Sequence, residues 1–181
     1  KNSNRSKNPF IVMNGALLQS DNYENELFGS ENKDGSVSYG FLEKASNGTL
    51  LIDEVSEIPL DTQAKILRVL IDQKFKRING TKDINVNIRI ISSTSKDLKS
   101  EVTMGNFRED LYHRINVVPI EIPKLSSRPD DIPILIKYFQ KKISEINGIP
   151  EIKLNVDEEL LYSYDWPGNV RELRNLVERI S

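Results

Sequence analysis

The stretch GTLLIDEV, residues 48–55, decides the fold, because its apolar run stops on two adjacent carboxylates, Asp53 and Glu54. A short run rich in leucine and isoleucine predicts a buried β-strand. Ligands of open α/β sheets bind beyond the carboxyl ends of the strands. An aspartate there can hold Mg²⁺, directly or through water, and its neighbour can orient or deprotonate a water that attacks a phosphoryl group. A solvated strand end followed by an acidic loop is the alternative interpretation.

Three more apolar runs predict strands: FIVMN (10–14), VNIRIISST (86–94) and VVPIEI (117–122). The clearest helical pattern covers residues 61–73, where Ala64, Leu67, Leu70 and Ile71 fall on one face. Strands that alternate with helices predict a mostly parallel sheet with crossover helices on its faces. The predicted fold class is therefore α/β.

Strand signals stop near residue 125, at a stretch rich in Ser, Pro and Asp, and only helical periodicity follows. Apolar stripes over 132–146 and 170–180 predict two helices, and residues 156–166 suit a shorter one. We therefore expect an α/β unit over residues 1–125 and a small all-helical unit over residues 126–181.

Composition narrows the functional classes. The 181 residues carry a formal charge of -2, which gives no global positive field for nucleic acid, so any DNA contact would come through a separate domain. The chain has no cysteine and a single histidine, His113, which excludes disulfides and thiolate metal sites. No apolar run approaches the length of a membrane span, so we expect no membrane partner and a cytoplasmic location.

Polar residues end two other predicted strands on the same edge of the sheet. Asn14 could donate its amide to Glu54, although an Asn-Gly turn without a ligand explains it equally. Thr94 and Ser95 could sense a terminal phosphate or position water, although hydroxyls at a strand end often satisfy the backbone instead.

Three arginines are further candidates. Arg108 and Arg114 flank an apolar helical stripe and could project to a neighbouring subunit, although solvated arginines would show the same pattern. Arg171 lies in the first turn of the last predicted helix, where a cation opposes the helix dipole at a cost of about 0.3 to 1 kcal/mol. A nucleotide phosphate could compensate for this placement, and so could Glu172.

Eight blocks occur in a characteristic order: PFIVMNG, ENELFG, GTLLIDEV, LDTQAKILRVL, VNIRIISSTS, FREDLYHRINVVPI, SRPDDIPIL and WPGNVRELRN. Together they resemble the central AAA+ ATPase domain of sigma-54-dependent bacterial transcriptional regulators, over essentially the whole chain. The resemblance implies a P-loop NTPase-type parallel sheet flanked by helices, followed by a helical lid. It also implies a ring, commonly a hexamer, with ATP and Mg²⁺ at each subunit interface.

The resemblance also assigns roles around the carboxylates. It makes Asp53 the indirect Mg²⁺ partner and Glu54 the water-activating carboxylate, and it makes Asn14 the residue that restrains this glutamate. Thr94 and Ser95 stand in the sensor I segment, where many relatives have Thr-Asn or Thr-His.

For the arginines, the resemblance implies action across subunits. Arg108 and Arg114 match the paired fingers that act on the nucleotide of the next subunit, and Arg171 matches the sensor II arginine. The parent would be a response regulator of a two-component system that controls transcription, with sigma factor and RNA polymerase as partners.

Two departures from the family pattern qualify these implications. No G-x-x-x-x-G-K segment occurs in the chain, and in this family the phosphate loop with its strand and helix lies just upstream of PFIVMN. We therefore expect that strand and helix to be absent, and this piece alone to bind ATP poorly.

The segment between Gly29 and Gly40 also lacks the family's GAFTGA contact loop and suits a plain turn, so we expect a parent that is not a conventional sigma-54 activator. A non-catalytic oligomerisation and interaction module is the alternative function.

Overall fold

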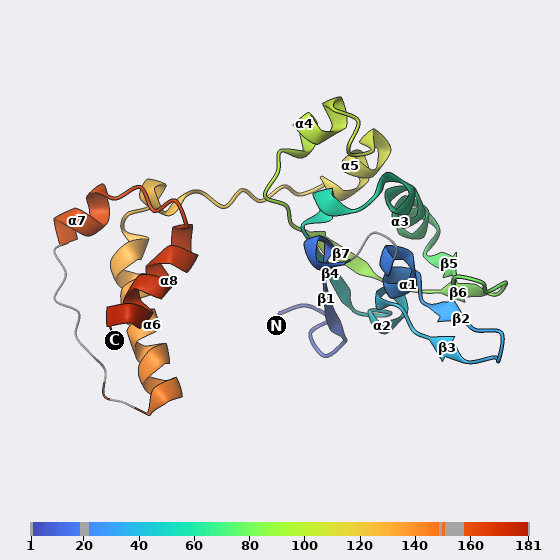
Figure 1. Ribbon diagram of the computed structural model, residues 1–181, viewed down its shortest axis with the longest axis horizontal. Coiled ribbons are helices and arrows are strands. Elements are labelled where there is room, and N and C mark those ends of the chain that lie inside the picture. The colour runs from blue at the N-terminus through green and yellow to red at the C-terminus, as the bar shows by residue number, and fades with distance from the viewer. Residues whose placement is uncertain (1, 19–21, 149, 151–157, 181) are drawn as a thin grey trace. The chain divides into compact units, whose positions relative to one another are not determined.

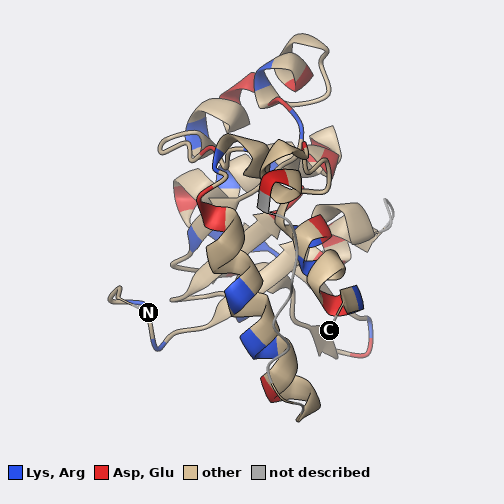
Figure 2. Cartoon of the chain, turned by 90° about the vertical axis from the view of Figure 1, so that its left-hand side faces the viewer, with Lys and Arg blue, Asp and Glu red and all other residues tan. Residues whose placement is uncertain are grey.

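The computed structural model describes residues 2–18, 22–148, 150 and 158–180. The chain forms two compact units, residues 1–119 and 120–181 (Figure 1). The contacts thus divide the chain a few residues before the predicted boundary. No helix in the described ranges is long and apolar enough to cross a bilayer. Lys and Arg residues are interspersed with Asp and Glu along the described chain (Figure 2).

The first unit is built on a three-stranded parallel sheet in the order β1-β4-β7. Its strands are β1 (Phe10–Asn14), β4 (Thr49–Asp53) and β7 (Arg89–Ser92). The strand predicted at 10–14 and the strand predicted in the apolar run of GTLLIDEV are confirmed. The third is shorter than predicted, because the backbone N–H groups of Val86 and Ile88 donate to Gln73 rather than to a neighbouring strand.

The predicted strand at residues 117–122 is wrong. The segment has no regular structure, and Val117, Val118, Ile120 and Ile122 are between 74% and 83% exposed. A strand exists only where a neighbour accepts and donates its backbone hydrogen bonds, and no strand of the described residues pairs with this segment. The segment also spans the point where the two compact units divide.

Two small antiparallel hairpins join the sheet unit. The first consists of β2 (Ser30–Glu31) and β3 (Val37–Ser38), and the second of β5 (Lys74–Lys76) and β6 (Asp83–Asn85). A backbone bridge between Ser30 and Ile78 connects them. The predicted plain turn between Gly29 and Gly40 is therefore a hairpin, closed by backbone bonds between Asn32 and Ser36 and between Gly35 and Asn32.

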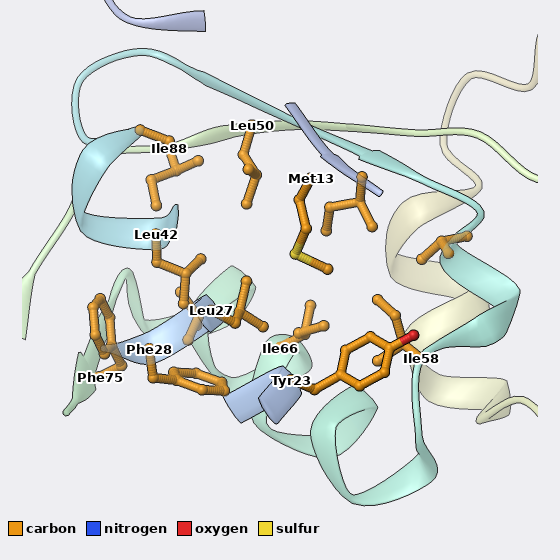
Figure 3. Close-up of a cluster of buried hydrophobic side chains, with 14 of the residues drawn as sticks. Met13, Tyr23, Leu27, Phe28, Leu42, Leu50, Ile58, Ile66, Phe75 and Ile88 are labelled. Atoms are coloured by element: carbon orange, nitrogen blue, oxygen red, sulfur yellow. The ribbon is translucent and has the colours of Figure 1, made fainter. Parts of the chain in front are cut away.

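Helices pack on one face of the sheet. They are α1 (Tyr23–Phe28), α2 (Phe41–Lys44), α3 (Leu60–Asp72), α4 (Leu98–Thr103) and α5 (Glu109–Ile115). Figure 3 shows Leu27, Leu42 and Ile66 from these helices meeting Met13 and Leu50 of the sheet. The apolar cluster formed there is the core of the first unit.

The helix predicted over 61–73 is confirmed, but its buried face is rotated. Thr62, Gln63, Ile66 and Val69 are the buried residues of α3, and Ile71 is exposed. The buried face is predicted incorrectly because it includes two polar side chains, Thr62 and Gln63, which do not contribute to an apolar periodicity.

The opposite face of the sheet is open along β1. Phe10 and Val12 of β1 are 59% and 53% exposed. Side chains alternate between the faces of a strand, so Asn14 shares this open face, and its register partner Asp53 lies beside it. The polar ends of β1 and β4 thus lie on the side of the sheet that the helices leave free.

The second unit contains α6 (Asp131–Asn147), α7 (Glu158–Ser163) and α8 (Asn169–Ile180), with no strand among its described residues. The two predicted apolar stripes are largely confirmed, although Ile146 and Ile180 at their ends are exposed. Its core residues are Leu125, Ile132, Leu161, Trp166 and Leu173. Residues 156 and 157 of the short predicted helix lie outside the described residues. Gly148 follows the last residue of α6, and its φ of 64° is the left-handed conformation that closes many helices.

Candidate functional site

The site begins where β4 ends. Asp53 is the last residue of the strand, and Glu54 follows it with φ 52° and ψ 56°, in the left-handed region. This conformation is uncommon for a residue with a side chain and often occurs at functional sites. It turns the chain sharply into the 3₁₀ turn Val55–Glu57, so that two successive carboxylates lie at the carboxyl end of the sheet.

The turn after β1 approaches these carboxylates closely. A Cβ on Gly15 would lie 2.5 Å from the carbonyl oxygen of Glu54, so only glycine fits. The buried Tyr23 hydroxyl donates to the carbonyl of Gly15 and lies 3.2 Å from that of Glu57. Burial, and then the charge of Glu57, raise the pKa of Tyr23. Tyr23 therefore ties together the two turns that carry the site.

Asn14 reaches the site but not the predicted residue. Its Nδ2 donates to Asp53 Oδ2 at 3.3 Å, and its Oδ1 accepts from the backbone N–H of Ala16 at 2.9 Å. The predicted hydrogen bond to Glu54 is not formed in the described structure. The register explains the difference, because Asn14 stands directly opposite Asp53 in the ladder.

The segment after β7 supplies hydroxyls to both carboxylates. Ser93 Oγ donates to Asp53 Oδ1 at 2.6 Å. The backbone N–H and the hydroxyl of Ser95 donate to Glu54 Oε2 at 3.0 and 3.1 Å. Thr94 turns away, since its hydroxyl donates to Ser56 at 2.9 Å. Ser93 is the site residue that the sequence analysis misses, and the alternation of an extended chain is the signal that could have found it.

Arg108 and Arg114 lie at the two ends of α5 and do not contact Asp53 or Glu54 in the described structure. The Arg108 guanidinium is half-exposed and bonds Asp110 at 2.7 and 3.0 Å. This pair raises the pKa of Arg108 and lowers the pKa of Asp110. Arg114 donates to the carbonyl of Leu70 at 3.0 Å.

Arg171 lies on the exposed side of α8 and makes no hydrogen bond or ion pair with the described residues. Glu172 accepts from the backbone N–H of Gly168 at 2.8 Å and from the Tyr164 hydroxyl at 2.9 Å. Glu172 thus caps the helix and does not compensate Arg171.

The oxygen chemistry of the site fits Mg²⁺. Carboxylates and hydroxyls are the hard donors that this ion prefers, and Asp53, Glu54 and Ser93 supply them. Among the described residues, no three His, Cys, Asp or Glu side chains gather into a metal cage. A site with only two adjacent carboxylates suits an ion that keeps several waters and takes phosphate oxygens as its other ligands.

A parallel sheet with paired carboxylates at its carboxyl end and a separate helical unit define the chain as an AAA+ module. The Sigma-54 interaction domain matches residues 1–121, and the AAA+ ATPase lid domain matches residues 126–181. The chain therefore belongs to the sigma-54 interaction domain family.

The chain is also similar to curated regulatory proteins. The chain is 47% identical over 180 residues to the nitrogen assimilation regulatory protein NtrX of Azorhizobium caulinodans, covering 98% of this chain and 40% of the relative. It is 44% identical over 183 residues to the regulatory protein AtoC of Escherichia coli K12, with coverages of 98% and 40%. The chain thus spans about 40% of the length of these relatives.

Solved structures show the same fold. NtrX from Brucella abortus in complex with ATP matches with a TM-score of 0.91 at 46% identity, covering 98% of this chain and 39% of that one. The complex of the same protein with ADP matches with a TM-score of 0.90 at 46% identity, covering 97% and 39%.

Proposed function

We propose that the chain is part of the ATP-binding and ATP-hydrolysing central domain of a cytoplasmic two-component response regulator that controls transcription. The observation that carries the proposal is the convergence of Asn14, Asp53, Glu54, Ser93 and Ser95 at the carboxyl end of one parallel sheet. The ATP and ADP complexes of the Brucella NtrX support the same ligand class.

Each carboxylate has a separate task in this proposal. Asp53 would hold Mg²⁺ through water, and the ion would neutralise developing phosphate charge. Glu54, the next residue along the chain, would accept a proton from the attacking water. Thr94, Ser95 and Arg171 would contact the nucleotide, although the hydrogen bond from Thr94 to Ser56 would have to open first.

The proposal includes a ring, with a hexamer expected, in which Arg108 and Arg114 reach the nucleotide of the next subunit. Their exposed positions on α5, and their lack of contact with the carboxylates in the described part of this subunit, support action in trans. An arginine that acts in this way is typically worth roughly 10³ to 10⁵ in turnover.

We also propose that the parent does not activate sigma-54 polymerase in the conventional way. In place of an extended contact loop, the β2–β3 hairpin closes on itself, and Arg77 fastens it through Glu31 at 2.8 Å. Sigma factor or polymerase contact would then use another surface, and DNA contact another domain. Efficient ATP-dependent open-complex formation at a sigma-54 promoter by the full-length protein would contradict this proposal.

The test of hydrolysis uses three variants of the full-length protein that contains this chain. Glu54→Gln should retain Mg-ATP binding and lose turnover, because it keeps the shape of the side chain and removes the base. Asp53→Asn should weaken the binding of Mg-ATP more than the binding of metal-free ATP. Glu145→Gln, an exposed change on α6, is the matched control.

Isothermal titration and phosphate release measure these effects. Full turnover in Glu54→Gln would refute the proposed base. Nucleotide binding without hydrolysis in the unmodified ring would favour the alternative, a non-catalytic oligomerisation module.

A further inference from the structure

The segment after β7 carries two serines whose contacts differ in a systematic way. Ser93 donates to Asp53 and Ser95 donates to Glu54, while Thr94 between them points to Ser56. The hydrogen bonds thus place the two serines on the side of the carboxylates and the threonine on the other side. Each carboxylate of the site therefore has its own serine.

The two carboxylates are held in different ways. Asp53 is anchored at both oxygens, by Ser93 on Oδ1 at 2.6 Å and by Asn14 on Oδ2 at 3.3 Å. Glu54 is anchored only at Oε2, where both bonds from Ser95 arrive. Its Oε1 receives no donor from the described residues and is available to accept a proton.

We propose that Ser93 and Ser95 are positioning residues with separate tasks, Ser93 fixing Asp53 for the divalent cation and Ser95 fixing Glu54 for proton transfer. This assignment rests on the proposed function. Hydrogen bonds to a metal-binding carboxylate hold it in the orientation that the metal needs. A base must likewise be held in place, since a displacement of about 1 Å can cost roughly 10²-fold in rate.

The separation of tasks gives a test with two independent readouts. Ser93→Ala and Ser95→Ala are compared in the full-length protein with Ser92→Ala, whose hydroxyl bonds no described residue. Electron paramagnetic resonance measures Mn²⁺ binding in the presence of ADP, and a steady-state assay measures kcat and KM at saturating Mg²⁺.

Ser93→Ala should raise the Mn²⁺ concentration for half-saturation by roughly tenfold. This is the lower end of the loss of metal affinity seen when a hydrogen bond to a metal-binding side chain is removed. Its kcat should recover when the metal saturates, and ADP affinity without metal should not change. Ser93→Thr keeps a hydroxyl and should restore metal affinity.

Ser95→Ala should leave Mn²⁺ affinity unchanged and lower kcat on the order of tenfold, because the backbone N–H of residue 95 still holds Glu54. Equal effects of the two variants on both readouts, or effects no larger than those of Ser92→Ala, would overturn the assignment of the serines alone. Absence of any metal-dependent ADP binding in the unmodified protein would overturn the proposed function together with this assignment.

Discussion

Asn14 and Asp53 face each other across two parallel strands, with the amide nitrogen of one 3.3 Å from a carboxylate oxygen of the other. In this structure the asparagine therefore bonds Asp53, the carboxylate that we propose holds Mg²⁺, while the backbone and hydroxyl of Ser95 hold the neighbouring Glu54. The family resemblance gives Asn14 a role beside Glu54, whereas the structure places its amide against Asp53.

Replacing Asn14 should consequently change the metal requirement rather than the maximal rate. Asn14→Ala removes a long hydrogen bond worth about 0.5 to 1 kcal/mol, so we expect the Mg²⁺ concentration for half-maximal activity to rise by roughly two- to fivefold. Asn14→Ser is the matched variant, because it can still cap the 3₁₀ turn at Ala16 but is too short to reach Asp53. A lower kcat at saturating Mg²⁺, with an unchanged metal requirement, would instead make Glu54 the functional partner.

The two arginines of α5 can be tested by mixing subunits. Arg114→Ala alone should lower ATP turnover by about 10³ or more and leave ATP binding intact, because a finger acts on the transferring phosphoryl group. Rings mixed from Arg114→Ala and Glu54→Gln subunits should regain part of the activity, since an intact finger can then face an intact base. Arg108→Ala should behave in the same way.

Arg68→Ala, an exposed change on α3, is the control for these finger variants. Mixed rings that stay as inactive as rings of either variant alone would show that finger and base act within one subunit.

Arg77 fastens the two hairpins and provides a test of stability. Its side chain is 11% exposed, and its guanidinium pairs with Glu43 at 2.6 Å and with Glu31 at 2.8 Å, which raises the pKa of Arg77. Arg77→Met leaves two carboxylates without their cation, so we expect a local loss of about 2 kcal/mol, below the values for fully buried pairs because Glu31 is partly exposed. Amide hydrogen exchange of peptides covering residues 29–44 and 74–85 measures this loss.

The matched change Lys65→Met breaks an exposed pair with Glu24 and should cost at most about 1 kcal/mol. Adding Glu31→Gln and Glu43→Gln to Arg77→Met should recover part of the stability, because no unpaired charge then remains. If the two single variants cost the same, the Arg77 cluster has no special structural role.

The sequence predicts those parts of the fold that depend on local signals. The apolar runs of β1 and β4 pair with each other, and the periodicity of α3 extends over 13 residues. The run at residues 117–122 fails, because a strand needs a partner and composition does not reveal one. The hairpins escape prediction for the same reason, since strands of two or three residues exist only through pairing.

The candidate site could likewise be predicted only in part. Parallel strands place their carboxyl ends at one edge, which brings Asn14, Asp53 and Glu54 together in the prediction and in the structure. The choice of partner depends on register and on the side to which each residue points. These properties decide that Ser93 reaches Asp53 and that Thr94 does not, and composition does not reveal them.

Tyr23 gives a prediction about alkaline pH. Figure 3 shows its ring at one end of the apolar core, and burial followed by the charge of Glu57 raises its pKa above the ordinary value of about 10. The folded protein then holds the phenolic proton more tightly than the unfolded chain. The resulting contribution to stability is fully present below about pH 10 and is lost as the pH rises through the higher pKa of the folded state.

Tyr23→Phe should lower stability at neutral pH by about 1 kcal/mol, because the carbonyls of Gly15 and Glu57 lose their shared donor. It should also reduce the loss of stability at alkaline pH, which for one proton amounts to at most about 1.4 kcal/mol per pH unit. Hydrogen exchange of peptides covering residues 10–57, corrected for intrinsic rates, measures both effects between pH 7 and 11. Tyr39→Phe, which keeps an exposed ring over Arg77, is the control and should leave the alkaline slope unchanged. Equal slopes in Tyr23→Phe and the unmodified protein would show that the buried hydroxyl does not set the alkaline limit of this unit.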